Sequence, residues 1–334
     1  MSYEDEDKMV HNKHCKEYKW YPMILPKQER IIAIGDLHGD YNLTLEVLKL
    51  ANVIDHNNKW IGGNTYVVQI GDQLDNCRPT NKRCDDPTNI SRSSYKGNKP
   101  EDIAIMEYMN ELHRQAEKVG GKVISLLGNH EIMNVEGFMD YVSYQDLKKS
   151  GNKKKRINDF KPGNKYAKLM ACSRLPAVII GSFIFVHAGF VNNFMKKLNI
   201  KKKDDMYNVS VTLRKWLLGL IDKDNVVNII NAPPDSMFWH RIIGQIPPNI
   251  SNNDPRCVKY IKDSLEFFNA KSMIIGHTPQ FSQNEGINKT CGDQIWRIDF
   301  GGSFVFSQFS NSDTRNAQVL EILNDEKINI LKKK

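Results

Sequence analysis

Three short apolar runs, each ending in glycine and a polar side chain, most constrain how this chain can fold. Residues 30–34 (RIIAI) lead into GDLHGD, residues 66–70 (YVVQI) into GDQLD, and residues 122–127 (KVISLL) into GNHE. Such β-branched runs bounded by glycine predict buried strands, and α/β sheets bind ligands beside the carboxyl ends of their strands. The polar residues that follow these runs, and that we expect to lie together, are Asp36, His38, Asp72, Asp75, Asn129 and His130.

Two later runs end in the same way. Residues 184–186 (IFV) precede HAG, which begins at His187, and residues 273–275 (MII) precede GHT, which contains His277. A single motif of this kind often has a structural role, such as capping a helix. Five strand ends that carry Asp, Asn and His in a set order instead predict one functional site.

The residue types at these strand ends suit metal binding. Carboxylates, an amide and imidazoles form a donor set that fits Mn, Fe or Zn better than Ca. Two metal ions about 3.5–4 Å apart can activate water and clamp a phosphoryl group, provided that one carboxylate bridges them. Asp72 is the candidate bridge. A histidine outside the metal shell can then protonate the leaving oxygen of a phosphate ester.

Length and composition fit a soluble globular protein of 334 residues, of which 40% are hydrophobic and 26% charged. We expect an N-terminal lead-in over residues 1–28 and a single catalytic domain over residues 29–334. Residues 76–101 predict a polar inserted loop, and residues 190–255 a mostly helical cap over the site. No apolar run approaches the roughly 20 residues of a membrane span, and the N-terminus lacks a secretory signal. A cytoplasmic location without membrane contact is therefore expected.

The basic excess of the chain is clustered. The net charge of +8 gathers in residues 148–156, 196–203 and 332–334. Such runs are typical of solvated loops and helix ends. The alternatives are electrostatic steering of an anionic substrate, a nuclear localisation signal, and contact with nucleic acid. Because no nucleic-acid-binding motif accompanies the charge, nucleic acid is a minor alternative as a partner.

The six cysteines are scattered and form no CxxC pair, so a structural zinc site is not expected. The only two that lie near each other in the sequence are Cys77 and Cys84. They could close a small loop, but a reducing cytoplasm favours free thiols. We therefore expect Cys77 and Cys84 to be unpaired.

The motifs resemble those of the calcineurin-like metallophosphoesterase superfamily, and more closely the phosphoprotein phosphatase family. The family's ordered motifs GDxHG, GDxxDRG, GNHE, HAG and GH stand here as GDLHG, GDQLDNC, GNHE, HAG and GHT, over roughly residues 30–305. The resemblance implies an α/β (α+β) fold, with a β-sandwich of two mixed sheets flanked by helices and metals at the strand ends.

The resemblance also implies a role for each matched residue. The implied ligands of the first metal are Asp36, His38 and Asp72. Those of the second metal are Asp72, Asn129, His187 and His277. His130 would be the general acid, oriented by Asp75, and a metal-bound hydroxide would attack the phosphorus directly. Among the candidate metals, Mn is favoured.

Two departures from the family pattern concern phosphate binding. The arginine of the family's Asp-Arg-Gly is replaced by Asn76, and Arg78 is a candidate substitute. The SAPNYC-type segment of eukaryotic Ser/Thr phosphatases is also absent, as it is in the Shewanella-like phosphatases. The Shewanella-like phosphatases carry a Leu-Trp-x-Arg segment instead, and residues 237–241 (MFWHR) look similar to it. Arg241 is therefore the best candidate for a phosphate-binding arginine, because a guanidinium fork matches phosphate oxygens, and Asn129 is a further candidate contact.

Several functions are compatible with these residues. The leading interpretation is a phosphomonoesterase that acts on phosphoprotein or phosphopeptide, with Ser/Thr or Tyr specificity open. Hydrolysis of a dinucleoside polyphosphate is the second enzymatic reading. Two further alternatives are a nuclease, which the basic runs suggest, and an inactive scaffold protein of the same fold. The complete set of metal-ligand candidates argues against a scaffold.

Overall fold

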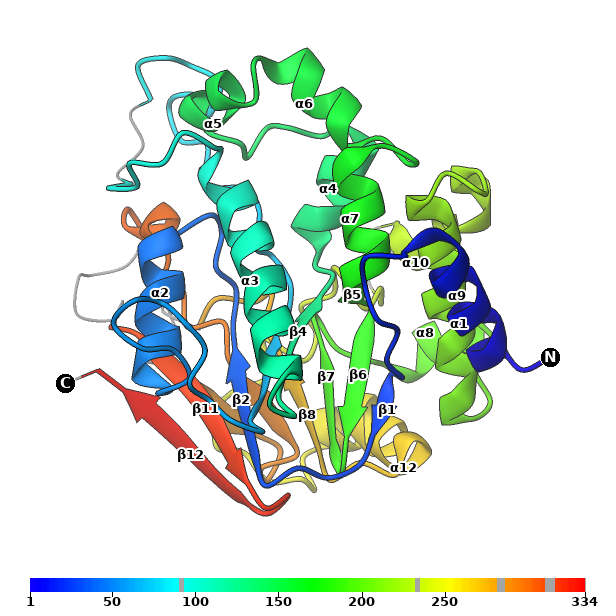
Figure 1. Cartoon of the computed structure of the whole chain (residues 1–334). Helices are drawn as coiled ribbons and strands as arrows, with labels where there is room; N and C mark the ends of the chain where they lie inside the picture. The colour runs from blue at the N-terminus through cyan, green and yellow to red at the C-terminus, as the bar shows by residue number, and fades with distance from the viewer. Residues whose placement is uncertain (90–92, 232–234, 281–285, 310–315, 334) are drawn as a thin grey trace.

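Two six-stranded mixed sheets lie at the centre of this computed structural model, within the described residues 1–89, 93–231, 235–280, 286–309 and 316–333 (Figure 1). One sheet consists, in order, of β1 (Ile24–Leu25), β6 (Ala177–Ile180), β7 (Phe183–Val186), β8 (Ser272–Ile275), β10 (Ile295–Arg297) and β9 (Asn288–Thr290). The other consists of β12 (Lys327–Lys332), β11 (Gln318–Leu323), β2 (Arg30–Ile34), β3 (Tyr66–Gln69), β4 (Lys122–Leu126) and β5 (Arg174–Leu175). The expected sandwich of two mixed sheets is confirmed.

Parallel pairing brings the predicted strand ends to one edge. β2 pairs in parallel with β3, and β3 with β4, so that Ile34, Gln69 and Ser125 stand in register. All of β3 and the last four residues of β2 and β4 are buried, as unbroken apolar runs predict. In the other sheet β7 pairs in parallel with β8. The loops that follow these strands therefore emerge in the same direction.

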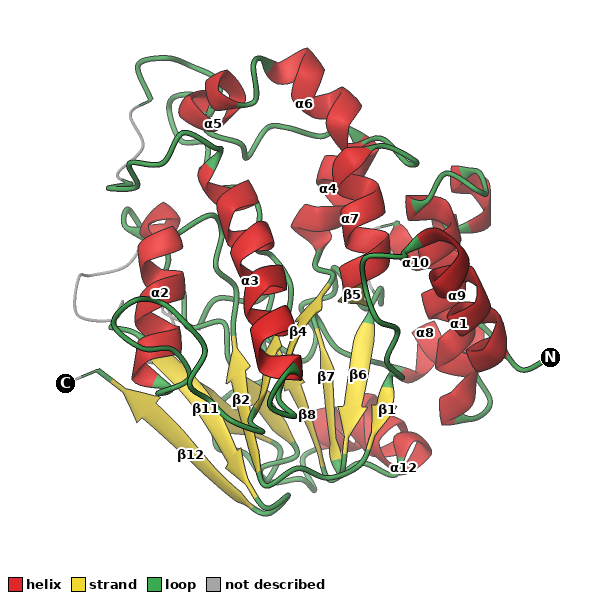
Figure 2. Ribbon diagram, in the orientation of Figure 1, coloured by secondary structure: helices red, strands yellow, loops and turns green. Residues whose placement is uncertain are grey.

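Helices flank the sheets (Figure 2). α2 (Tyr41–Leu50) and α3 (Glu101–Glu117) lie in front of the sheet that contains β2. The helical spacing of Ile103, Met106 and Met109 predicts α3. Asp40 caps α2, as its position before the apolar pattern predicts, because its Oδ1 accepts a hydrogen bond of 2.9 Å from the Leu43 amide. Among the described residues, no helix combines the length and apolar composition needed to cross a bilayer.

A helical excursion connects β4 to β5 at the top of Figure 1. α4 begins at the asparagine of GNHE, soon after β4 ends, and leads through two short helices to α7, which precedes β5. The bounds are α4 (Asn129–Glu136), α5 (Tyr144–Lys149), α6 (Lys153–Phe160) and α7 (Lys165–Ser173). The basic run of residues 148–156 thus spans the junction of α5 and α6.

The N-terminal segment differs from the loosely ordered lead-in that we expected. It begins with α1 (Tyr3–His14), whose first turn is closed by a capping box between Ser2 and Asp5. α1 packs against α9 (Met206–Leu217), and Asp7 forms a buried ion pair with Arg214 at 2.9 Å. The sequence did not reveal this because the ion-pair partner lies 207 residues further along the chain.

The disulfides contradict the expectation that Cys77 and Cys84 are free thiols. All six are paired, as Cys15–Cys172, Cys77–Cys84 and Cys257–Cys291. Two of the pairs join residues that are 157 and 34 positions apart, so spacing could not reveal them. The third closes the small loop considered from the sequence.

The two insertions expected from composition have different outcomes. The described part of residues 76–100 has neither helix nor strand, which agrees with a loop. Among the described residues of the range 190–255, the α-helices lie mainly in the first part, which contains α8 (Asn192–Lys197), α9 and α10 (Val227–Ile230). α9 contacts α1 and α7, so these helices form a flank, whereas the later residues Trp239 and Arg241 contact the strand-end cluster. The apolar residues within 301–306 (GGSFVF) predict a strand, but the structure has a 3-10 helix over Phe304–Phe306 instead. The helix before β8 comprises α11 (Pro255–Cys257), a π-helical turn (Val258–Lys262) and α12 (Asp263–Phe268).

Candidate metal centre

The five strand ends meet in one buried cluster. The residues that the sequence assigned to metal binding are all buried and all lie in it: Asp36, His38, Asp72, Asn129, His187 and His277. Positive φ angles between 42° and 71° occur at four residues of the cluster: His38, Asp72, Asp75 and His277. Residues other than glycine rarely adopt this backbone conformation, and backbone strain of this kind is concentrated at functional sites.

The glycines of the motifs are required by crowding around the carboxylates. A Cβ on Gly128 would lie 2.2 Å from Asp72 Oδ1, and a Cβ on Gly276 would lie 2.3 Å from Asp36 Oδ1. No side chain fits at either position. GNHE and GHT therefore begin with glycine so that their backbones can approach the carboxylates of the neighbouring strand ends.

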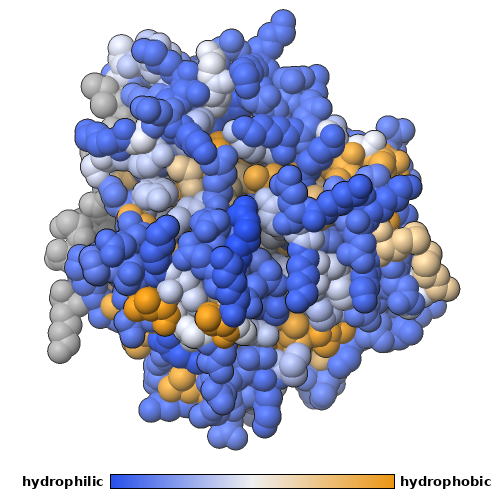
Figure 3. All heavy atoms as spheres, in the orientation of Figure 1, coloured by the Kyte–Doolittle hydropathy of each residue, from blue (hydrophilic) through white to orange (hydrophobic). Residues whose placement is uncertain are grey.

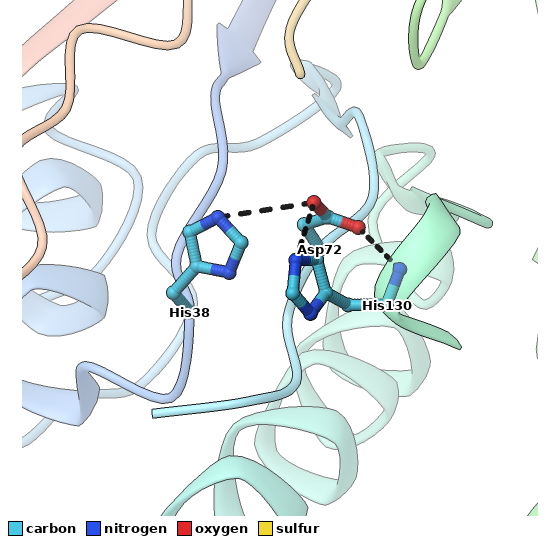
Figure 4. Close-up of side chains that lie close together, drawn as sticks. All are labelled: His38, Asp72 and His130. Atoms are coloured by element: carbon cyan, nitrogen blue, oxygen red, sulfur yellow. Dashed lines mark hydrogen bonds and ion pairs between the residues drawn. The ribbon is translucent and has the colours of Figure 1, made fainter. Parts of the chain in front are cut away.

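Asp72 is at the centre of the cluster (Figure 4). Its Oδ2 lies 3.8 Å from His38 Nε2, 3.9 Å from His130 Nε2 and 3.4 Å from His187 Nε2. Its Oδ1 accepts a hydrogen bond of 2.9 Å from the His130 amide, which fixes the carboxylate in place. One carboxylate thus faces imidazoles that come from three different strand ends, as a bridging ligand would.

On the other side of Asp72, an amide lies between two imidazoles. Asn129 Oδ1 is 2.9 Å from His187 Nε2 and 2.9 Å from His277 Nδ1. The second nitrogen of each ring contacts a backbone carbonyl, that of Ile70 at 2.9 Å and that of Trp239 at 2.8 Å. Such carbonyl contacts orient a histidine so that the other nitrogen can bind a metal.

The donor atoms fall into two groups that could each hold a metal ion. One group is His38, Asp72 and His130, and the other is Asp72, His187 and His277. Asp72 belongs to both, in agreement with a bridging role. His130, which the resemblance assigns to acid catalysis, is in the first group, whereas Asp36 is beside it, with Oδ2 at 3.9 Å from His38 Nε2.

Buried carboxyl groups accumulate here, which makes the site suitable for cations. Burial and the neighbouring Asp299 and Asp72 raise the pKa of Asp36 well above its usual range. Burial raises the pKa of Asp299 to about 6, and its Oδ2 has no hydrogen-bond partner in the part of the chain that the structure describes. Burial opposes ionisation of Asp72 too, but His187, His130 and His38 hold its pKa well below the usual range. Divalent cations would relieve this crowding, so the residues fit a metal centre.

A histidine–aspartate pair stands beside the donor groups. Asp75 Oδ2 lies 2.6 Å from His130 Nδ1, and both side chains are buried. The contact leaves Nε2 as the ring nitrogen of His130 that can face a substrate. Glu131, the last residue of GNHE, has a structural role, because its carboxylate accepts hydrogen bonds from the amides of Gly128 and Asp72 at 2.7 and 2.8 Å.

Both candidate phosphate-binding arginines reach the cluster. Arg78 Nη2 lies 2.9 Å from His38 Nε2, and its guanidinium lies 5.3 Å from the ring of Tyr141 and 5.0 Å from that of Phe306. Arg241 Nη1 donates a hydrogen bond of 2.7 Å to the carbonyl of His277. Arg78 lies close to the proposed metal ligands, while Arg241 is exposed at the rim.

Other residues around the cluster were not found from the sequence. Tyr141 and Phe306 hold Arg78 and also make edge contacts with His130 and His38, with ring centroids 5.2 and 5.3 Å apart. Asp299 lies outside the five matched motifs. An isolated aromatic residue or aspartate has no sequence signal of its own, although the phrase DFGG after a strand could have marked Asp299.

The sequence between residues 29 and 281 matches the family model for calcineurin-like phosphoesterases. The chain belongs to this family. Members of this family depend on metal ions, which agrees with the two groups of candidate metal ligands in the site. The motif-based assignment to the calcineurin-like family is thus confirmed.

Relatives of this phosphoesterase include named protein phosphatases. An uncharacterized protein of Acanthamoeba polyphaga mimivirus is 37% identical over 252 residues, which are 69% of this chain and 99% of the relative. Shewanella-like protein phosphatase 2 of Arabidopsis thaliana is 27% identical over 83% of this chain and 72% of its own. Shewanella-like protein phosphatase 1 of Plasmodium berghei is 27% identical over 82% of this chain and 67% of its own. The similarity to Shewanella-like phosphatases inferred from the motifs is confirmed.

Solved structures support the fold of this phosphoesterase. A cold-active protein tyrosine phosphatase superposes with a TM-score of 0.66 at 18% identity, over 94% of this chain and 83% of that chain. A cold-active protein tyrosine phosphatase of a psychrophilic Shewanella species gives a TM-score of 0.62 at 20% identity, with the same shares covered. At these identities the similarity demonstrates the shared fold.

Proposed function

We propose that this phosphoesterase hydrolyses phosphomonoesters and acts on phosphoproteins, with two divalent metal ions as cofactors and Mn favoured over Fe and Zn. The observation that carries the proposal is the position of Asp72 Oδ2, which lies within 3.9 Å of imidazoles from three strand ends. Asp36, His38 and Asp72 would hold one ion, and Asp72, Asn129, His187 and His277 the other. The metal ions, when bound, would supply a water-derived nucleophile at neutral pH and neutralise phosphoryl charge.

The protein side chains would bind the phosphate and supply the proton. Arg78, close to His38 and held between two aromatic rings, would bind phosphoryl oxygens, with Arg241 and Asn129 as further contacts. His130 would protonate the leaving oxygen from Nε2, because Nδ1 is engaged by Asp75 at 2.6 Å. The carboxylate of Asp75 would stabilise the protonated imidazole before it donates.

The named relatives support a protein substrate. Two of them are Shewanella-like protein phosphatases, and the chain covers at least 67% of each. A dinucleoside polyphosphate is the alternative substrate, and a nuclease and an inactive scaffold remain the outcomes to distinguish. The geometry favours an active enzyme over a scaffold, since every implied ligand is present in one cluster.

The location in the cell is part of the proposal. The sequence favours the cytoplasm, with the nucleus as the alternative suggested by its basic runs. Three disulfides are instead typical of an oxidising compartment. Alkylation of thiols in protein taken from its native cell, followed by mass spectrometry, decides between them: modification of the cysteines supports the cytoplasm or nucleus.

Phosphate release by metal-stripped protein tests the function. Phosphoserine, phosphothreonine and phosphotyrosine peptides are assayed for released phosphate. A dinucleoside polyphosphate and single-stranded DNA, whose hydrolysis yields nucleotides, are assayed for nucleotide products by chromatography. Each substrate is tested with Mn, Fe(II) or Zn added. We expect Mn-dependent release from a phosphopeptide that is lost in Asp72→Asn and in His130→Asn and retained in His56→Asn, a matched control at an exposed histidine. A folded wild-type protein that releases phosphate from no phosphopeptide with any metal would refute the proposal.

A further inference from the structure

A buried arginine lies behind the His130–Asp75 pair. Arg156 belongs to the basic run that the sequence analysis assigned to solvent, yet it is 1% exposed. Its guanidinium donates to both carboxylate oxygens of Asp102, at 3.1 and 2.6 Å. On the face shown in Figure 3, hydrophilic residues cover much of the region of α5 and α6. Arg156 is nevertheless buried, as is Phe160 of the same helix.

The same guanidinium also holds an asparagine. Arg156 Nε and Nη2 donate to Asn134 Oδ1 at 3.3 and 3.0 Å. With its oxygen engaged in this way, the Asn134 amide must direct Nδ2 to the other side. There Nδ2 donates to Asp75 Oδ1 at 2.7 Å and to the carbonyl of His130 at 2.9 Å. The contacts with Arg156 therefore determine which end of the Asn134 amide faces Asp75.

Asp75 is held on both its carboxylate and its backbone. Its Oδ1 accepts from Asn134 and its amide donates to Asp102 Oδ2 at 3.2 Å, which leaves Oδ2 for His130. Both contacts lead back to Arg156. Without the guanidinium, the Asn134 amide could turn and present its oxygen to the Asp75 carboxylate, and the two acceptors would repel each other. The imidazole of His130 would then lose its fixed orientation.

We propose that Arg156 and Asn134 are positioning residues that hold His130, through Asp75, in the orientation required to protonate the leaving oxygen. The proposal rests on the proposed function, in which His130 is the acid. It goes beyond the family resemblance, which assigns a role to Asp75 and His130 alone. It also gives the buried arginine of the basic run a function.

The dependence of rate on the leaving group separates positioning from a general structural role. Phenyl phosphate needs a proton for its leaving oxygen, whereas 2,4-dinitrophenyl phosphate has a leaving group that departs without one. The experiment measures kcat/KM for both substrates with the Mn-loaded full-length protein. We expect Arg156→Met and Asn134→Ala to lower the value for phenyl phosphate about 10- to 100-fold more than that for 2,4-dinitrophenyl phosphate, since general acid catalysis contributes roughly 10²–10⁴-fold. His130→Asn should show the same selectivity, and adding Asn134→Ala to it should not increase that selectivity.

Two controls make the comparison specific. Arg214→Met also removes a buried guanidinium from an ion pair, but one remote from the site, and Lys154→Met removes an exposed charge from the helix of Arg156. We expect both to lower the two values by equal factors or not at all. Equal losses for the two substrates in Arg156→Met and Asn134→Ala would overturn the proposal. Arg156→Lys, which keeps the charge but loses the fork, provides the same readout if Arg156→Met does not fold.

The experiment distinguishes failure of the positioning proposal from failure of the proposed function. If wild type hydrolyses neither aryl phosphate with any metal, the phosphomonoesterase assignment is wrong and the positioning proposal falls with it. If wild type hydrolyses both and the variants show no leaving-group selectivity, the positioning proposal alone is wrong.

Discussion

Replacement of Asp7 by alanine should destabilise this phosphoesterase strongly, because it leaves a guanidinium buried without its counter-charge. Asp7 is 0% exposed and Arg214 is 4% exposed, and Arg214 Nε lies 2.9 Å from Asp7 Oδ1. The carboxylate also accepts hydrogen bonds from Trp20 Nε1 at 2.9 Å and from Ser210 Oγ at 3.2 Å. The variant would remove the shared partner of all three donors and loosen α1 from α9.

The expected magnitude follows from burial. Removing one partner of a buried ion pair costs about 3–5 kcal/mol, mainly because the remaining charge stays in a low-dielectric environment. A neighbouring pair between the same two helices, Glu6 with Lys215, is 27% and 30% exposed. Such a partly solvated pair contributes only about 0–1 kcal/mol. Glu6→Ala is therefore a matched control on the same helix.

Urea unfolding followed by tryptophan fluorescence measures both variants, and Trp20 reports directly on the interface. We expect Asp7→Ala to lower the free energy of unfolding by about 3–5 kcal/mol and Glu6→Ala by less than about 1 kcal/mol. Adding Arg214→Met to Asp7→Ala should recover part of the loss, because the unpaired charge disappears. If Asp7→Ala costs no more than Glu6→Ala, the assumption that burial makes this pair critical is wrong.

Three further predictions concern the metal centre, the disulfides and a buried carboxyl group. Asp72→Asn should weaken Mn binding, measured by calorimetry, by more than roughly 100-fold, since even outer-shell changes cost about 10–100-fold. Cys15→Ser opens a disulfide that spans 157 residues and should cost about 5 kcal/mol in urea unfolding, whereas Cys84→Ser, which opens a span of 7, should cost about 2 kcal/mol; equal costs would contradict the loop-entropy estimate. Burial and the neighbouring Asp102 raise the pKa of Asp146 to about 8. The folded state therefore keeps a proton that the unfolded state loses near pH 4, so stability falls by up to about 1.4 kcal/mol per pH unit as pH rises towards 8. Asp146→Asn should flatten this decline in urea unfolding between pH 5 and 8, and an unchanged slope would exclude Asp146 as its source.

The sequence predicted the strand ends and the residues that they carry. Each run of β-branched residues that stops at Gly-Asp, Gly-Asn or Gly-His is a local signal, because the end of a buried strand and the need for glycine are decided within a few residues. Their convergence followed from the rule that parallel strands end at one edge. The cap of α2 by Asp40 and the hairpin of β6 and β7 likewise depend on residues that are close together in the sequence.

The expectations that failed concern contacts between distant parts of the chain. The basic run gave no sign that Arg156 alone turns inward, since its partner Asp102 lies 54 residues earlier. The N-terminal segment has a polar composition that is typical of a loose lead-in, and only the contact of Asp7 with Arg214 explains its packed helix. Residues 190–231 carry helical patterns, but which part of the molecule those helices cover is not encoded in their spacing.

The sequence by itself therefore determined the order of the motifs of this phosphoesterase, the residues of the candidate metal centre, and the candidate pair of Asp75 and His130. Tertiary structure alone decided what surrounds these residues, including Arg78 between two aromatic rings, the buried Arg156, and the disulfides. The physical reason is range. Strand ends are specified by neighbouring residues, whereas burial of a charge or pairing of two thiols depends on which distant surfaces meet when the two sheets and their helices pack.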